Sequence, residues 1–157
     1  MKQIKVVARG TGASNNDALG ANGIINVSFN EPVTIEAGSR IALDKFYCYL
    51  HIDGTNAQAL ADFPDLAIEM SSLNFESYDS DKRGRRNVVS YFPVQNSFVA
   101  GGSGVSPRFI YEAKVLSYLS INNEMDIDIS TIVFRVVNIK TGLPLLANYV
   151  SFNLLIN

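Results

Sequence analysis

The sequence predicts an all-β protein of one domain, built as an antiparallel sandwich or barrel of short strands. Apolar residues alternate with polar ones in many segments, and turn residues separate these segments at intervals of about ten residues. The only stretch with helical character, 56–62, stops at Phe63-Pro64 and is two turns at most. We expect residues 1–157 to form a single domain, because strands resume directly on both sides of every loop.

Eight or nine strands are expected, and they follow one another from one end of the chain to the other. The alternation is clearest at 66–70 and 149–156, where every second residue is apolar, as in a half-buried strand. The other expected strands are 4–7, 25–29, 33–35, 40–52, 88–94, 109–121 and 131–139.

The segment 40–52 is expected to be the central strand. Its apolar residues occupy odd positions up to Leu43 and even positions from Phe46 onward. Either a β-bulge or a strand that is covered on both faces would explain this change. Phe46 is therefore expected to lie buried between two sheets.

Composition excludes most enzymes and several kinds of partner. The chain has 13 basic and 15 acidic residues, a net charge of −2, which disfavours electrostatic binding of nucleic acid. One histidine, His51, and one cysteine, Cys48, leave little material for a zinc site, a catalytic triad or a disulfide. We expect no enzyme, cofactor or metal. The sequence has no run of 18 apolar residues and no apolar stretch behind Met1, so neither membrane insertion nor a secretory signal is expected.

The candidate interface residues are a basic cluster and a set of loop asparagines. The cluster consists of four cations within five residues, in a chain that is acidic overall. A solvated hairpin tip would explain it, and its functional alternatives are an acidic neighbour, a nucleic acid or a glycan. Docking of an acidic partner is the best of these functional interpretations. The Gly- and Asn-rich loop 10–23 is expected to be flexible, too polar to join the core, and able to reach over a neighbouring subunit. Glycine and asparagine are also common in ordinary turns, where they serve no binding function. The candidates are Lys82, Arg83, Arg85, Arg86, Asn15, Asn16 and Asn22.

Three acidic residues, Glu124, Asp126 and Asp128, occupy alternate positions. On a strand their carboxylates would face the same way. Such a group could hold Ca²⁺, which prefers carboxylate oxygens. The favoured interpretation is a solvated strand face or a charged edge that prevents pairing with other strands.

Four segments, taken in order, resemble the small jelly-roll capsid proteins of virophages and polinton-like viruses, the penton and minor-capsid group. They read GSRIALDKF (38–46), IEM with LNFESY (68–70 and 73–78), FIYEA leading to YLSINN (109–113 and 118–123), and VFRVVN with GLPL (133–138 and 142–145). The resemblance covers about residues 33–156 and departs from the family pattern after Phe46.

The resemblance implies a single eight-stranded jelly roll and a structural role in the virion, as a penton at a vertex or as a minor capsid subunit. It implies assembly inside the host cell through loops and sheet edges. The implied partners are further copies in a closed homo-oligomer, with a pentamer favoured, and the major capsid protein of the same virion. The alternative is a receptor- or glycan-binding β-sandwich such as a vertex fibre head, which would need exposed tyrosine or tryptophan; the chain has no tryptophan.

Overall fold

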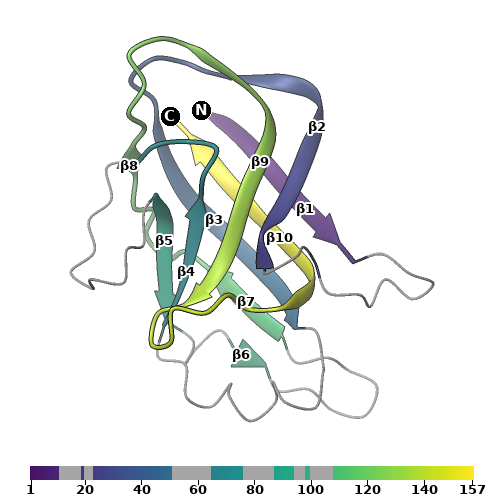
Figure 1. The fold of residues 1–157 in the computed structure, drawn as a ribbon. Coiled ribbons are helices and arrows are strands. Elements are labelled where there is room, and N and C mark those ends of the chain that lie inside the picture. The colour runs from purple at the N-terminus through teal and green to yellow at the C-terminus, as the bar shows by residue number, and fades with distance from the viewer. Residues whose placement is uncertain (11–18, 20–22, 51–64, 76–86, 94–97, 100–107) are drawn as a thin grey trace.

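A computed structural model describes residues 1–10, 19, 23–50, 65–75, 87–93, 98–99 and 108–157. In these residues the regular structure is ten β-strands and no α-helix, and the strands form two antiparallel sheets packed together (Figure 1). The strands are β1 (Lys2–Arg9), β2 (Ile25–Ile35), β3 (Arg40–Leu50), β4 (Asp65–Met70), β5 (Val88–Pro93), β6 (Phe98–Val99), β7 (Arg108–Glu112), β8 (Leu119–Ser120), β9 (Ile127–Asn138) and β10 (Ala147–Ile156). This confirms the all-β sandwich.

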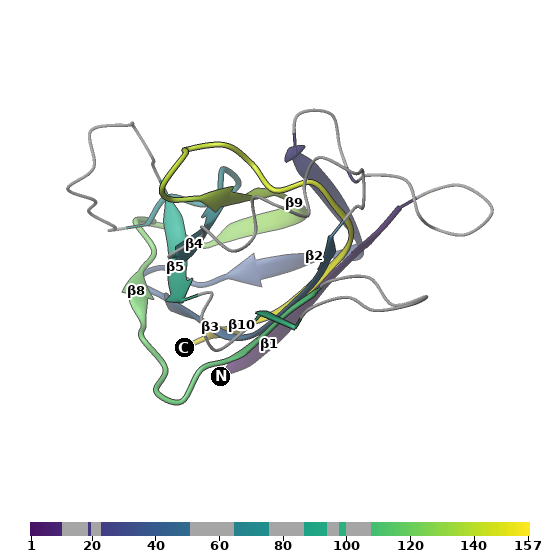
Figure 2. The ribbon, with the colours of Figure 1, turned by 90° about the horizontal axis from the view of Figure 1, so that it is seen from below.

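The order of the strands follows a nested pattern. The first sheet has the order β1-β10-β3-β7-β6, with β8 paired to the start of β3, and the second has the order β2-β9-β4-β5 (Figure 2). Four antiparallel pairs join the first half of the chain to the second half in reverse order: β1 with β10, β2 with β9, β3 with β7, and β4 with β5. The two termini consequently lie side by side, with Lys2 opposite Ile156 (Figure 1).

Aromatic side chains from the two sheets meet in the core. Phe46 of β3 contacts Phe92 of β5, with ring centroids 4.8 Å apart. Phe152 of β10 meets Phe134 of β9 edge to face, also at 4.8 Å. Phe46 is fully buried, as the sequence predicts. Each contact joins one sheet to the other, so the burial of these rings holds the sandwich together.

A β-bulge at Asp44 explains the change of apolar phase in β3. Leu43 lies opposite Leu154 of β10, whereas Lys45 lies opposite Asn153, so Asp44 is the extra residue. The bulge reverses which positions of β3 face the core. β3 lies between β10 and β7, which confirms that it is an inner strand.

A predicted strand is interrupted next to this bulge. Residues 109–121 were expected to be one strand, but β7 ends at Glu112 and β8 spans only Leu119–Ser120. The amide of Ala113 donates to the carbonyl of Asp44 at 2.8 Å, and Val115 is 83% exposed. The chain therefore leaves β3 at the bulge and returns to it only at β8.

The expectation that the segment 10–23 stays outside the core is wrong at Leu19. Leu19 is buried in the hydrophobic core, and its amide donates to the carbonyl of Ala147 at 2.6 Å. The amide of Gly10 donates to the carbonyl of Asn148, also at 2.6 Å. A single leucine thus ties a polar segment to the start of β10. The predicted short helix at 56–62 lies outside the described residues.

Candidate functional site

All the interface candidates from the sequence lie outside the described residues, and so does His51. The interface candidates are Lys82, Arg83, Arg85, Arg86, Asn15, Asn16 and Asn22. Their role in assembly stays a prediction.

The three acidic residues do not share a strand face. β9 begins at Ile127, so Glu124 and Asp126 precede the strand, and only Asp128 belongs to it. The carboxylate of Asp126 accepts a hydrogen bond from the amide of Ala37 at 2.8 Å, and Asp128 accepts one from the Thr34 hydroxyl at 2.6 Å. These bonds tie the end of β2 to the start of β9. No group of three or more His, Cys, Asp or Glu side chains within the described ranges could hold a metal ion.

Cys48 is buried in the first sheet as a free thiol. Burial disfavours the thiolate and raises the pKa of Cys48 to about 12. Because the thiolate is the nucleophilic form, this thiol is inert at neutral pH. Cys48 packs as a small apolar side chain in the core.

The open side of the sandwich, between β1 and β2, is the candidate site. β1 and β2 are the outermost strands of their sheets at this side, paired with β10 and β9 respectively. In the part of the chain that the structure describes, neither strand pairs along its other edge. Free edges carry unpaired backbone N–H and C=O groups, which can pair with a strand of another chain.

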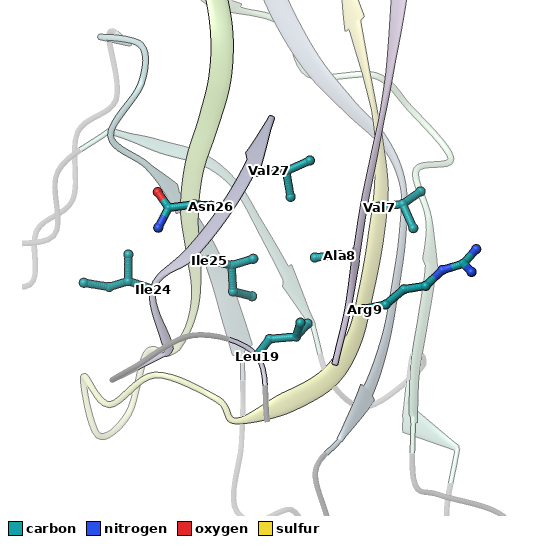
Figure 3. A pocket seen from close by; sticks show the side chains of 8 residues that line it. All are labelled: Val7, Ala8, Arg9, Leu19, Ile24, Ile25, Asn26 and Val27. Atoms are coloured by element: carbon teal, nitrogen blue, oxygen red, sulfur yellow. The ribbon is translucent and has the colours of Figure 1, made fainter. Parts of the chain in front are cut away.

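A hollow of about 690 Å³ lies between these two edges (Figure 3). Four apolar side chains point into it, and the remaining lining residues point away to the outer faces of the sheets (Figure 3). Those pointing inward are Ala8, Leu19, Ile25 and Val27; those pointing away are Val7, Arg9, Ile24 and Asn26. The hollow is suited to contact with an apolar group, because all four side chains that point into it are apolar.

The two edges differ in how well they are protected. The pairing of β2 with β9 is irregular between Ser28 and Val33, and Pro32 lies within this stretch without an amide hydrogen to donate. The pairing of β1 with β10 runs without a break over eight residues, about 26 Å. β1 therefore presents the longer regular edge for another strand.

A glycine fixes the chain at one end of the hollow. Gly23 has φ of +73°, a conformation that residues with a side chain rarely adopt. A Cβ at this position would lie 2.5 Å from Cβ of Pro144. The backbone before β2 therefore passes against the connection between β9 and β10, and only glycine leaves room for it.

Sequence reasoning missed Leu19 and the importance of the β1 edge. Ile4, Val6 and Ala8 occupy alternate positions and are buried, and the apolar residues at 4–7 signal the strand itself. Which strands lie at the edge depends on pairing across the whole chain, which no local pattern contains. Comparison with protein-family models, with curated proteins and with solved structures finds no match.

Proposed function

We propose that this chain is a single jelly roll of eight strands and that it serves as a structural subunit of a virus particle, a penton or a minor capsid protein. The observation that carries the proposal is the nested pairing of β1 with β10, β2 with β9, β3 with β7, and β4 with β5, divided between two sheets. A long antiparallel hairpin rolled in this way is the jelly-roll pattern, which is frequent in viral capsid domains. On this interpretation the two-residue strands β6 and β8 are marginal additions.

The segments that resemble capsid proteins support the same role. Residues 38–46 contribute the turn before β3 and its first half, and residues 133–138 form the last half of β9. Both strands are inner strands of their sheets. The resemblance is therefore carried by the framework of the sandwich, as expected if the two chains share a fold.

The open side between β1 and β2 supports a role in assembly. A subunit of a closed ring must present two different surfaces, one for each neighbour. The free edge of β1 and the apolar hollow beside it provide a further surface, available to a different neighbour in the particle. Further copies of this chain, in a pentamer, and the major capsid protein of the same particle are the proposed partners.

The mass of the purified full-length protein in solution tests this proposal. Light scattering after gel filtration, over a range of micromolar concentrations, should give a species larger than one chain, with five times 17.2 kDa as the favoured value. A mass of 17.2 kDa at every concentration would contradict assembly into a closed ring.

A further inference from the structure

The outer face of the first sheet carries a row of tyrosines between two arginines. Arg9 of β1 lies opposite Tyr149 of β10, Tyr149 lies opposite Tyr49 of β3, and Tyr49 lies opposite Arg108 of β7. The rings of Tyr49 and Tyr149 meet edge to face at 5.6 Å, and Tyr49 is 38% exposed. Figure 3 shows Arg9 pointing away from the hollow toward this face. In the described part of the chain neither arginine forms an ion pair.

Two neighbouring rows extend this surface, which we call the tyrosine–arginine face. The middle row is mainly apolar, and the last row contains two lysines and an acid. The middle row is Val7, Ser151, Tyr47 and Ile110; the last row is Lys5, Asn153, Lys45 and Glu112. Ile110 is 37% exposed, Val7 and Tyr47 are half-buried, and Ser151 is buried between them. Partly exposed apolar and aromatic side chains with cations around them are typical of a protein–protein contact, where tyrosine and arginine are enriched.

The lysines of the last row are positioned by their neighbours. Lys5 lies over the ring of Tyr47, with its Nζ 6.0 Å from the ring centre. Lys45 forms an ion pair with Glu112 at 3.0 Å, and the hydrogen bond and charge of Glu112 raise the pKa of Lys45. Lys45 is therefore charged at neutral pH.

The charge of this face selects its partner. It has four cations against two acids, Glu112 and the bulge residue Asp44, which gives a net charge of +2 on a chain of net charge −2. The rest of the chain must then carry −4. Two copies of the face would repel each other, whereas the face and the remainder of a second copy attract.

Four acidic residues gather at the far end of the sandwich and form what we call the acidic end. They are Glu36, Glu124, Asp126 and Asp128. Asp126 and Asp128 accept hydrogen bonds from residues at the end of β2, and the side-chain amide of Asn123 donates to the backbone carbonyl of Glu36 at 3.0 Å. Glu124 is exposed, and no ion pair to it occurs in the described residues.

The acidic end and the tyrosine–arginine row lie at opposite ends of the strands. Glu36 pairs with Lys2 at 3.1 Å, at the start of β1, whereas the row begins at Arg9, the last residue of β1. Seven residue steps along a strand separate these positions by about 23 Å. One subunit therefore offers a basic surface at one end and an acidic surface at the other.

We infer that the tyrosine–arginine face of one copy docks on the acidic end of a second copy. This inference rests on the proposed function, because it names the contact through which copies assemble. Such a head-to-tail contact joins two different surfaces and repeats from copy to copy, as a closed ring requires.

Neutralising the two arginines tests the face directly. The full-length variant Arg9→Gln/Arg108→Gln should associate about tenfold more weakly than the wild type in light scattering and sedimentation at 0.1 M salt. Lys114→Glu is the matched control, because it changes the net charge by the same amount at an exposed site outside the face. The control should associate as the wild type does. Circular dichroism and denaturant melts establish that both variants fold.

Reversing the charges of each surface identifies the partner. Arg9→Glu/Arg108→Glu and Glu36→Lys/Glu124→Lys should each be monomeric alone. Mixed in equal amounts, they should assemble again into species larger than one chain of 17.2 kDa, in which the two variants alternate, because each face then meets an end of opposite charge. A chain that carries all four changes should self-associate again.

The oligomeric states of the wild type and of the arginine variants test the docking contact and the proposed structural role separately. If the wild type assembles and the arginine variants assemble equally well, the inference is wrong while the structural role stands. If the wild type is a monomer throughout, both are wrong. Binding of heparin by such a monomer, lost in Arg9→Gln/Arg108→Gln, would assign the face to an anionic glycan instead.

Discussion

Replacing Phe46 by alanine tests how the two sheets are held together. The ring is fully buried, contacts Phe92 of the opposite sheet at 4.8 Å between centroids, and lies opposite Phe152 on the neighbouring strand. Its removal takes away the transfer free energy of a phenyl ring, leaves a cavity, and breaks an aromatic pair worth about 0.5–1.5 kcal/mol. β3 is paired with β10 and β7 along this stretch, so its backbone cannot move in to fill the space. We expect a loss of about 4–5 kcal/mol in the free energy of unfolding.

Equilibrium unfolding in urea, followed by circular dichroism, measures this loss. A domain of ordinary stability unfolds with about 5–15 kcal/mol, so Phe46→Ala should lower the midpoint severely or leave the chain unfolded. Phe46→Leu keeps most of the volume and should cost less than Phe46→Ala. Val115→Ala, at a residue that is 83% exposed, should change stability by less than about 0.5 kcal/mol. A loss below about 1 kcal/mol for Phe46→Ala would refute the packing described for β3.

Three further changes test particular contacts. Gly23→Ala should lower the free energy of unfolding more than Gly38→Ala does, although both glycines have φ of +73°. The reason is that a Cβ at Gly23 would meet Pro144, whereas a Cβ at Gly38 would meet nothing within 4 Å. Equal losses for the two variants in urea melts would contradict this. Cys48 should not react with a thiol reagent until the protein unfolds. Because burial raises the pKa of Cys48 from 9.0 to about 12, stability that is present below pH 9 is lost as the pH rises, and from pH 8 to 10 the wild type should lose about 1 kcal/mol more than Cys48→Ala. A wild type and Cys48→Ala that lose stability in parallel would show that the thiol does not titrate in this way. Replacing residues 11–18 by two glycines should leave the chain folded, because the amides of Gly10 and Leu19 bond to the adjacent carbonyls of Asn148 and Ala147. The variant should assemble more weakly than the wild type, because the loop is expected to reach over a neighbour; equal assembly would show that it does not.

The strands were largely predictable, because alternation is a local property. The inward positions of β10, for example, follow directly from Val150, Phe152, Leu154 and Ile156. The bulge in β3 was also visible, as a change of apolar phase after Leu43. The interruption between β7 and β8 was not, because it depends on how these residues pair with β3, which lies far away in the sequence.

The surfaces were less predictable, because they depend on which strands become neighbours. Arg9, Tyr49, Arg108 and Tyr149 are unremarkable outward positions in four separate segments, and pairing across the sheet places them in one row. Glu124 and Asp126 fit a strand pattern by spacing, yet the chain reaches β9 only at Ile127. Spacing gives the orientation of a side chain only where the strand actually forms.

We propose that this chain is a subunit that joins copies of itself head to tail into a closed ring. Electron microscopy of the purified full-length protein tests it most directly, because class averages reveal the symmetry of an assembly without labels or partners. We expect closed rings of five copies, in which each subunit is about the size of a 17.2 kDa sandwich and neighbouring subunits have the same orientation around the ring. Isolated monomers, or pairs related by a twofold axis through the tyrosine–arginine face, would contradict it.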